Sequence, residues 1–168
     1  MTPNVLTVSG FLVTLSAACV VSFGYLFAGG LLVLFAGLFD LLDGALARAK
    51  EQSTKFGAFL DSTLDRISEA ALFFGLLVFY YIDDPKTPEV WLIYLALAGS
   101  LMVSYTRARA EGLGLKCESG VFTRAERVVL MAVGLLINQM LFVLVILSTL
   151  TWITVIQRFL SVRKQTRG

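Results

Sequence analysis

Four aspartates in two close pairs are the residues of this chain whose types and positions most directly indicate chemistry. They occur in the frame Asp40-x2-Asp43-Gly44-x2-Ala47-Arg48-x8-Gly57-x3-Asp61-x3-Asp65. The surrounding segments are apolar, and one aspartate at a bilayer centre costs roughly 2.5–3.5 kcal/mol on insertion scales. Four carboxylates near one depth therefore need cations, water or hydrogen-bond donors, and the sequence predicts a functional acidic site.

The spacing of the aspartates predicts two pairs that face each other. Asp40 and Asp43 are three residues apart, and Asp61 and Asp65 are four apart, so each pair lies on one face of a helix. An antiparallel hairpin brings the two pairs together. The chain has no histidine, which leaves carboxylates as the main candidates for acid–base and metal chemistry. Magnesium and manganese prefer oxygen ligands, and paired metals assist phosphoryl transfer, so four aspartates suit two such ions.

The residues between the aspartates indicate a bulky phosphate-bearing ligand. Gly44 and Gly57 allow a ligand to approach the backbone, and Ala47 leaves space beside them. Arg48 offers a planar, permanently charged fork that suits the oxygens of a diphosphate.

Composition predicts an all-α membrane protein with one domain over residues 1–168. Hydrophobic residues make up 57 % of the chain, and six apolar runs are long enough to cross a bilayer. They leave no room for a separate soluble domain, and the first run lacks the features of a cleaved signal peptide. The six expected spans are Val5 to Phe27, Leu31 to Ala49, Ala58 to Ile82, Val90 to Ala110, Phe122 to Ile137 and Met140 to Leu160.

The connections between these spans predict the orientation of the protein in the cell membrane. We expect turns on one side at Gly29-Gly30, Asp83 to Glu89 and Asn138-Gln139. The start of the chain, Lys50 to Phe56, Gly112 to Gly120 and Ser161 to Gly168 then share the other side. Of 14 basic residues, Lys86 alone falls on the first side. This asymmetry predicts that both termini and the aspartates face the cytoplasm.

The aspartate frame resembles the signature of the CDP-alcohol phosphotransferases at every motif position from Asp40 to Asp65. The resemblance implies a homodimer among membrane lipids that uses a CDP-linked lipid substrate and binds no nucleic acid. It also implies roles for the motif residues. Two divalent metals, Mg²⁺ or Mn²⁺, would be bound by Asp40, Asp43, Asp61 and Asp65, with Asp65 also the general base; the CDP moiety would be held by Gly44, Ala47, Arg48 and Gly57.

A second resemblance concerns the acceptor. The segments Gly57 to Arg66, Ser104 to Glu111 and Gly120-x3-Arg124-Ala125-Glu126-Arg127 resemble the inositol phosphate-using branch of the family. That branch transfers a lipid-phosphate group from CDP-diacylglycerol, or from a CDP-linked archaeal lipid, to inositol phosphate and releases CMP.

Basic residues at the expected cytoplasmic ends of the last three spans suit an anionic acceptor. They are Arg107, Arg124, Arg127 and Arg158, and the resemblance adds Ser104. Any one of these arginines can instead mark topology and meet anionic lipid heads, a role that fits Arg109 better. This branch often has lysine at the position of Arg107.

Two alternative functions follow from the same residues. One is transfer to glycerol phosphate or another small alcohol. The other is divalent-cation transport, because acids within spans also mark ion pathways. The aspartates cluster with Arg48 and do not form a relay toward Asp83 or Asp84, which favours the enzyme. Asn4 and Thr7 are explained equally well by helix capping and stay outside the predicted site.

Overall fold

Six α-helices form the protein over the residues that the structure describes. The structure is a computed structural model in which the backbone is described for residues 3–49, 54–117 and 119–167, and the side chains for residues 4–39, 54–117 and 119–167. The predicted all-α fold is confirmed. The helices are α1 (Pro3–Ser22), α2 (Leu26–Ala49), α3 (Lys55–Asp83), α4 (Pro88–Gly112), α5 (Arg124–Ile137) and α6 (Met140–Gln165).

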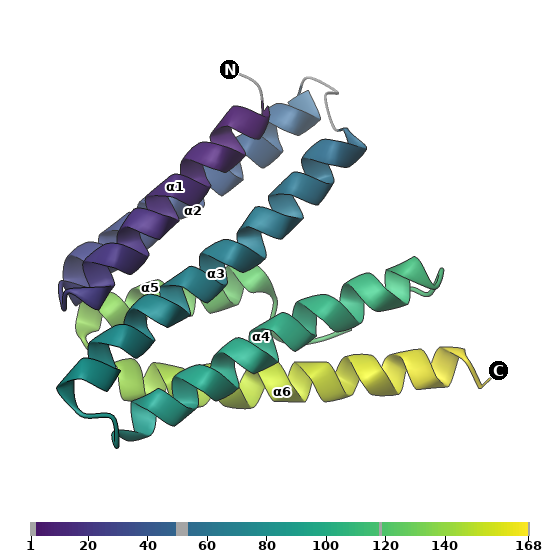
Figure 1. The fold of residues 1–168 in the computed structure, drawn as a ribbon. Coiled ribbons are helices and arrows are strands. Elements are labelled where there is room, and N and C mark those ends of the chain that lie inside the picture. Colours follow the sequence, from purple (N-terminus) through teal and green to yellow (C-terminus); the bar gives the residue numbers. More distant parts are fainter. Residues whose placement is uncertain (1–2, 50–53, 118, 168) are drawn as a thin grey trace.

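The helices pack as two connected groups (Figure 1). Helix α1 contacts both α2 and α3, while α4 packs along α6. The shorter helix α5 contacts α2 and α6, and α3 contacts α4, so these helices join the two groups. The start of α1, the end of α2 and the start of α3 lie at the same end of the bundle. The two halves of the aspartate frame are therefore carried to one end of the fold.

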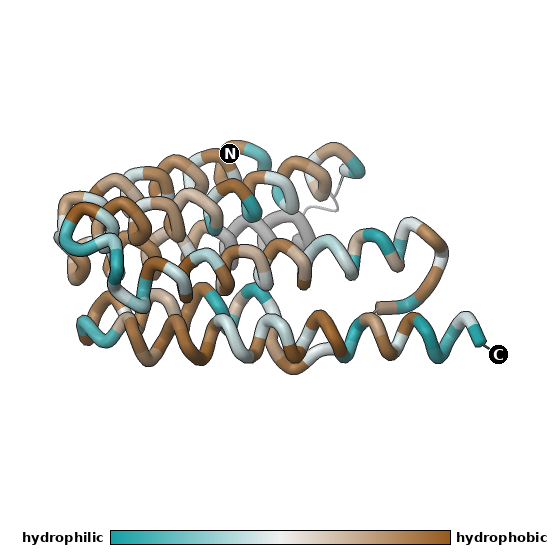
Figure 2. Tube along the Cα trace, turned by 60° about the horizontal axis from the view of Figure 1, so that its bottom comes forward, coloured by the Kyte–Doolittle hydropathy of each residue, from teal (hydrophilic) through white to brown (hydrophobic). Residues whose placement is uncertain are grey.

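Hydropathy along the chain agrees with a membrane protein. Three helices are long and apolar enough to cross a bilayer, namely Asn4–Ser22, Pro88–Gly112 and Met140–Gln165, and Leu26–Phe39 is a shorter apolar helix, all within the described part of the chain. Hydrophobic residues dominate the helices, and hydrophilic ones gather at the turns and helix ends (Figure 2). That all six helices cross the membrane, and that both termini face the cytoplasm, stay predictions.

Small residues let the helices approach closely. A Cβ atom at Gly75 of α3 would lie 2.3 Å from the backbone oxygen of Ala18 in α1. A Cβ atom at Gly99 of α4 would lie 2.2 Å from Oγ1 of Thr151 in α6. This packing is typical of helices in lipid, where dispersion contacts drive association in place of the hydrophobic effect.

The predicted turn at Gly29 and Gly30 is wrong. Both glycines lie inside α2, and the chain turns at Gly24, whose φ of +86° favours a residue without a side chain. Gly29 instead packs against α1, because a Cβ atom there would lie 2.3 Å from Cγ2 of Val21. The first predicted span was thus too long at its end, and the second began too late.

The other connections differ less from the expectation. Asn138 adopts the left-handed conformation (φ 54°) in the predicted α5–α6 turn, and α3 and α4 are separated where expected. Helix α6 continues past Leu160 to Gln165, whose Nε2 donates a 2.7 Å hydrogen bond to the Lys116 carbonyl. Helix α5 starts at Arg124, two residues later than the predicted span.

The starts of α3 and α5 are fixed by capping residues. Thr54 caps α3, and its hydroxyl accepts a 2.9 Å hydrogen bond from the Gly57 backbone N–H. Lys55, which we placed in the linker, therefore belongs to the helix. At α5 the backbone N–H and hydroxyl of Thr123 donate to the Glu126 carboxylate. Residues 50–53 of the predicted linker lie outside the described residues.

Candidate active site

One face of α3 carries a row of acidic side chains. Asp61, Asp65 and Glu69 follow each other at intervals of four residues, one helical turn apart. The Asp65 side chain is 13 % exposed, whereas Glu69 is buried. The capped start of α3 thus places a partly open carboxylate above a buried one.

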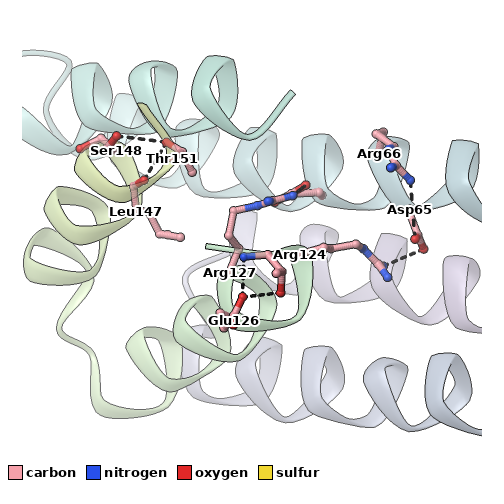
Figure 3. Close-up of polar contacts among 10 residues, drawn as sticks. Asp65, Arg66, Arg124, Glu126, Arg127, Leu147, Ser148 and Thr151 are labelled. Carbon is pink, nitrogen blue, oxygen red and sulfur yellow. Dashed lines mark hydrogen bonds and ion pairs between the residues drawn. The ribbon is translucent and has the colours of Figure 1, made fainter. Parts of the chain in front are cut away.

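Arginines from α5 and α3 flank Asp65 (Figure 3). Arg124 Nη2 lies 2.8 Å from Asp65 Oδ1, and Arg66 Nη1 lies 3.8 Å from Asp65 Oδ2. Arg124 is the first residue of α5, so the Thr123 cap sets its position. The charge of the predicted general base is compensated by two nearby guanidinium groups.

The other half of the aspartate frame lies at the C-terminal part of α2. The backbone of Asp40, Asp43, Gly44, Ala47 and Arg48 is helical, but their side chains lie outside the described residues. Among the residues that are described, no three histidine, cysteine or acidic side chains form a group able to hold a metal ion. Asp61 and Asp65 provide oxygen donors one turn apart, a donor set that fits a hard divalent cation.

Gly57 lies where α1 and α3 approach each other. A Cβ atom there would lie 3.0 Å from Thr54 Oγ1 and 3.1 Å from Asn4 Oδ1. Atoms of the protein itself therefore leave little room for a side chain at this position, and the role of Gly57 in holding the CDP moiety stays a prediction. Asn4, which we left outside the site, lies directly beside a predicted nucleotide contact.

Two of the predicted acceptor arginines are buried and engaged by the protein itself. Arg127 is 2 % exposed and forms a two-point ion pair with Glu69, with Nε 2.7 Å from Oε1 and Nη2 2.9 Å from Oε2. Arg158 is 5 % exposed, donates from Nε to the Ser119 carbonyl at 3.0 Å, and donates from Nη1 to the Val103 carbonyl. These contacts fix the orientation of both guanidinium groups.

The structure divides the predicted acceptor residues between two hollows. Ser104 and Arg107 line a groove between α3 and α4, beside Arg66. Arg124 and Arg127 line a cavity between α1, α2, α3 and α5, together with Glu69. Arg158 lines neither hollow and is held by the carbonyls of Ser119 and Val103.

Gly120 shapes the loop beside Arg158. Its φ of +133° is unfavourable for residues with a side chain, and a Cβ atom would lie 2.6 Å from Thr154 Cγ2 and 3.3 Å from Arg158 Nε. The predicted motif that starts at this glycine therefore has a structural basis, since the loop must press against α6 before α5 begins.

Sequence reasoning missed Glu69 and Arg66 as neighbours of the site. Glu69 continues the four-residue spacing of Asp61 and Asp65, and this signal was present in the sequence. Arg66 follows Asp65 directly, but adjacent residues point in different directions on a helix. Only the structure shows its guanidinium returning to the Asp65 carboxylate.

The CDP-alcohol phosphatidyltransferase family matches residues 1–160 of this chain. Archaetidylinositol phosphate synthase of Pyrococcus horikoshii is 38 % identical over 166 residues, which cover 98 % of this chain and 85 % of the relative. Two crystal structures of Mycobacterium tuberculosis phosphatidylinositol phosphate synthase superpose with a TM-score of 0.90 at 35 % identity and cover 96 % of this chain. In the first, which has CDP-DAG bound, the match covers 86 % of the mycobacterial chain; in the second, which is in complex with manganese and citrate, it covers 82 %.

The chain therefore belongs to the CDP-alcohol phosphatidyltransferase family. It is an enzyme of the CDP-alcohol phosphotransferase class, similar to the archaetidylinositol and phosphatidylinositol phosphate synthases.

Proposed function

We propose that this enzyme transfers a lipid-phosphate group from a CDP-linked lipid to inositol phosphate and releases CMP. The observation that carries the proposal is Asp65, a carboxylate only 13 % exposed, aligned with Asp61 on α3 and held by Arg124. The similarity to inositol phosphate-using synthases, one with CDP-DAG bound, supports the choice of acceptor and donor.

The reaction needs a base near the acceptor hydroxyl. Asp65 accepts the proton of that hydroxyl, and the oxygen attacks the phosphorus on the lipid side of the diphosphate. The new O–P bond forms as the bond from this phosphorus to the bridging oxygen breaks, and CMP leaves with that oxygen. The Asp65 side chain keeps a small exposed fraction of 13 %, which suits a group that must meet substrate and then return its proton to water.

Divalent metal ions, Mg²⁺ or Mn²⁺, would be held by Asp40, Asp43, Asp61 and Asp65. When bound, two such ions supply neutralisation of the charge that develops on the diphosphate. The manganese complex of the mycobacterial synthase supports this assignment. Gly44, Ala47, Arg48 and Gly57 hold the CDP moiety in this proposal.

The acceptor phosphate is assigned to Ser104, Arg107, Arg124, Arg127 and Arg158. Ser104 and Arg107 lie on α4, Arg124 and Arg127 on α5, and Arg158 on α6. The direct contact of Arg124 with Asp65 connects this set to the proposed base. We further propose that the site faces the cytoplasm, where nucleotide and sugar phosphate are found, and that the enzyme works as a homodimer.

The experiment is an acceptor panel with purified protein and either magnesium or manganese. CDP-diacylglycerol and a CDP-linked archaeal ether lipid serve as donors, and inositol phosphate, glycerol phosphate and free inositol serve as acceptors. We expect CMP release only when inositol phosphate is the acceptor. Release only with glycerol phosphate would overturn the acceptor assignment, and no release with any pair would overturn the proposed reaction.

A further inference from the structure

A buried ion pair lies one helical turn beyond the proposed base. Glu69 is 8 % exposed and Arg127 2 % exposed, and their two contacts of 2.7 Å and 2.9 Å join α3 to α5. The same two helices are joined by the Asp65–Arg124 pair. Asp65 and Glu69 are four residues apart on α3, and their partners Arg124 and Arg127 are three residues apart on α5, so each pair lies on one face of its helix. The two ion pairs therefore fix one helix against the other.

Stability alone does not explain a charged pair at this place. Removing two charges from water costs as much as their attraction returns, and apolar residues of similar size often serve a buried position equally well. The cavity beside the pair is lined largely by apolar residues, among them Leu72 and Met131. A role that needs the charge of Arg127 accounts better for the pair.

The geometry of the pair leaves one part of the guanidinium for a ligand. Glu69 engages Nε and Nη2, whereas Nη1 has no hydrogen-bond partner among the described residues. An arginine presents five N–H donors in a fixed plane, so holding one edge determines where the other donors lie.

We propose that Glu69 is a positioning residue for the acceptor phosphate. Its carboxylate grips Arg127 by one edge, so that Nη1 is held ready to donate to the phosphate. Glu69 also compensates the buried charge of Arg127 while the acceptor is absent. This inference rests on the proposed function, because it assumes that Arg127 receives the phosphate of the acceptor.

The experiment compares Glu69→Gln and Glu69→Asp with wild-type enzyme. Glu69→Gln keeps the shape but offers one acceptor oxygen to the guanidinium, so Arg127 turns away from its fixed orientation. We expect the KM for inositol phosphate to rise about tenfold, which corresponds to one charge-assisted hydrogen bond. The KM for the CDP-linked lipid stays at its wild-type value. Glu69→Asp keeps the negative charge, but its side chain is shorter and cannot grip Arg127 in the same way. Its acceptor KM should therefore lie between those of the wild type and Glu69→Gln.

Glu89→Gln is the control for the acid-to-amide change. Glu89 lies in the first turn of α4, whereas the predicted acceptor residues of this helix, Ser104 and Arg107, lie in its C-terminal half. The acceptor KM of Glu89→Gln should be that of the wild type. If Glu69→Gln does not fold, Glu69→Asp carries the test, because it buries no unpaired arginine. A wild-type acceptor KM in a folded Glu69 variant would overturn the inference.

A double-mutant cycle separates positioning from general loosening of the bundle. Arg127→Gln raises the acceptor KM by itself, and adding Glu69→Gln to it should cause no further rise, because Glu69 acts through Arg127. An additive second rise would contradict the inference. Calorimetric binding of inorganic phosphate, without donor, repeats the cycle independently of turnover. If wild-type enzyme fails in the acceptor panel yet the phosphate cycle shows this pattern, the proposed function fails and the role of Glu69 stands.

Discussion

Arg124 Nη2 and Asp65 Oδ1 lie 2.8 Å apart and join the first turn of α5 to the acidic face of α3. The Thr123 cap fixes the position of Arg124 at the start of α5. Asp65 lies on the same face of α3 as Asp61, four residues further along the helix. It places a fixed positive charge beside the carboxylate proposed to take the acceptor proton.

Replacement of Asp65 tests the proposed base. Asp65→Asn keeps the size of the side chain but removes its ability to accept a proton, and general-base catalysis contributes typically about 10²–10⁴-fold to rate. We expect CMP formation to fall by at least that factor while the protein elutes as a folded species in detergent. Asp83→Asn, at the exposed opposite end of α3, should retain full activity. Undiminished CMP formation in Asp65→Asn would show that Asp65 is not the general base.

Arg124 should matter through its charge. Arg124→Ala removes the nearer cation from Asp65, and loss of one charge-assisted contact of about 1.5–3 kcal/mol corresponds to roughly a 10- to 100-fold lower kcat/KM for the acceptor. Arg124→Lys should retain a larger share of the activity. Steady-state CMP release at several acceptor concentrations measures both. Arg109→Ala is the control, since Arg109 is exposed near the end of α4, and equal losses in Arg109→Ala and Arg124→Ala would refute the specific role.

Arg158 and Arg107 should respond differently to truncation. Arg158→Ala removes the hydrogen bonds from the guanidinium to the carbonyls of Ser119 and Val103. A hydrogen bond from a charged group contributes about 1.5–3 kcal/mol, so we expect a lower melting temperature as well as a lower acceptor affinity. Arg107, whose side chain is 55 % exposed and pairs with Glu111, should lose acceptor affinity alone. Thermal melting in detergent beside acceptor KM values distinguishes the two. Equal melting temperatures would show that the buried contacts of Arg158 add no stability.

Gly75 offers a test of the helix packing. Gly75→Ala places a methyl group 2.3 Å from the Ala18 carbonyl oxygen, so α1 and α3 must separate, and overpacking of this kind costs typically about 1–3 kcal/mol. We expect a clearly lower melting temperature. Gly37→Ala is the matched control, because a Cβ atom there has nothing within 4 Å. A Gly75→Ala variant as stable as Gly37→Ala would show that the close contact is not required.

Much of the fold follows from local patterns in the sequence. The α5–α6 turn was predicted because Asn138 interrupts two apolar runs, and Asn is among the few residues that adopt the left-handed conformation readily. The Gly29–Gly30 turn was wrong because paired glycines serve two purposes. In a membrane bundle they also allow close packing, and only the position of Val21 against Gly29 shows which purpose applies.

The site was predictable to the extent that its spacing is local. Asp61 and Asp65 share a helix face by periodicity alone. The nearer cation beside Asp65, Arg124, comes from α5, more than fifty residues later in the chain. In the same way, no periodicity pairs Glu69 with Arg127 across 58 positions. The predicted acceptor residues were grouped by charge and by expected depth, whereas the structure shows that α3 separates the groove of Arg107 from the cavity of Arg127.

Electron paramagnetic resonance of Mn²⁺ added to purified protein shows whether the four aspartates hold divalent metal ions. We expect saturable binding of two Mn²⁺ ions per chain. Binding should be weaker in Asp61→Asn, unchanged in Asp83→Asn, and stronger when a CDP-linked lipid is added. A wild-type protein that binds no Mn²⁺ at saturating concentrations, with or without that lipid, would contradict this expectation.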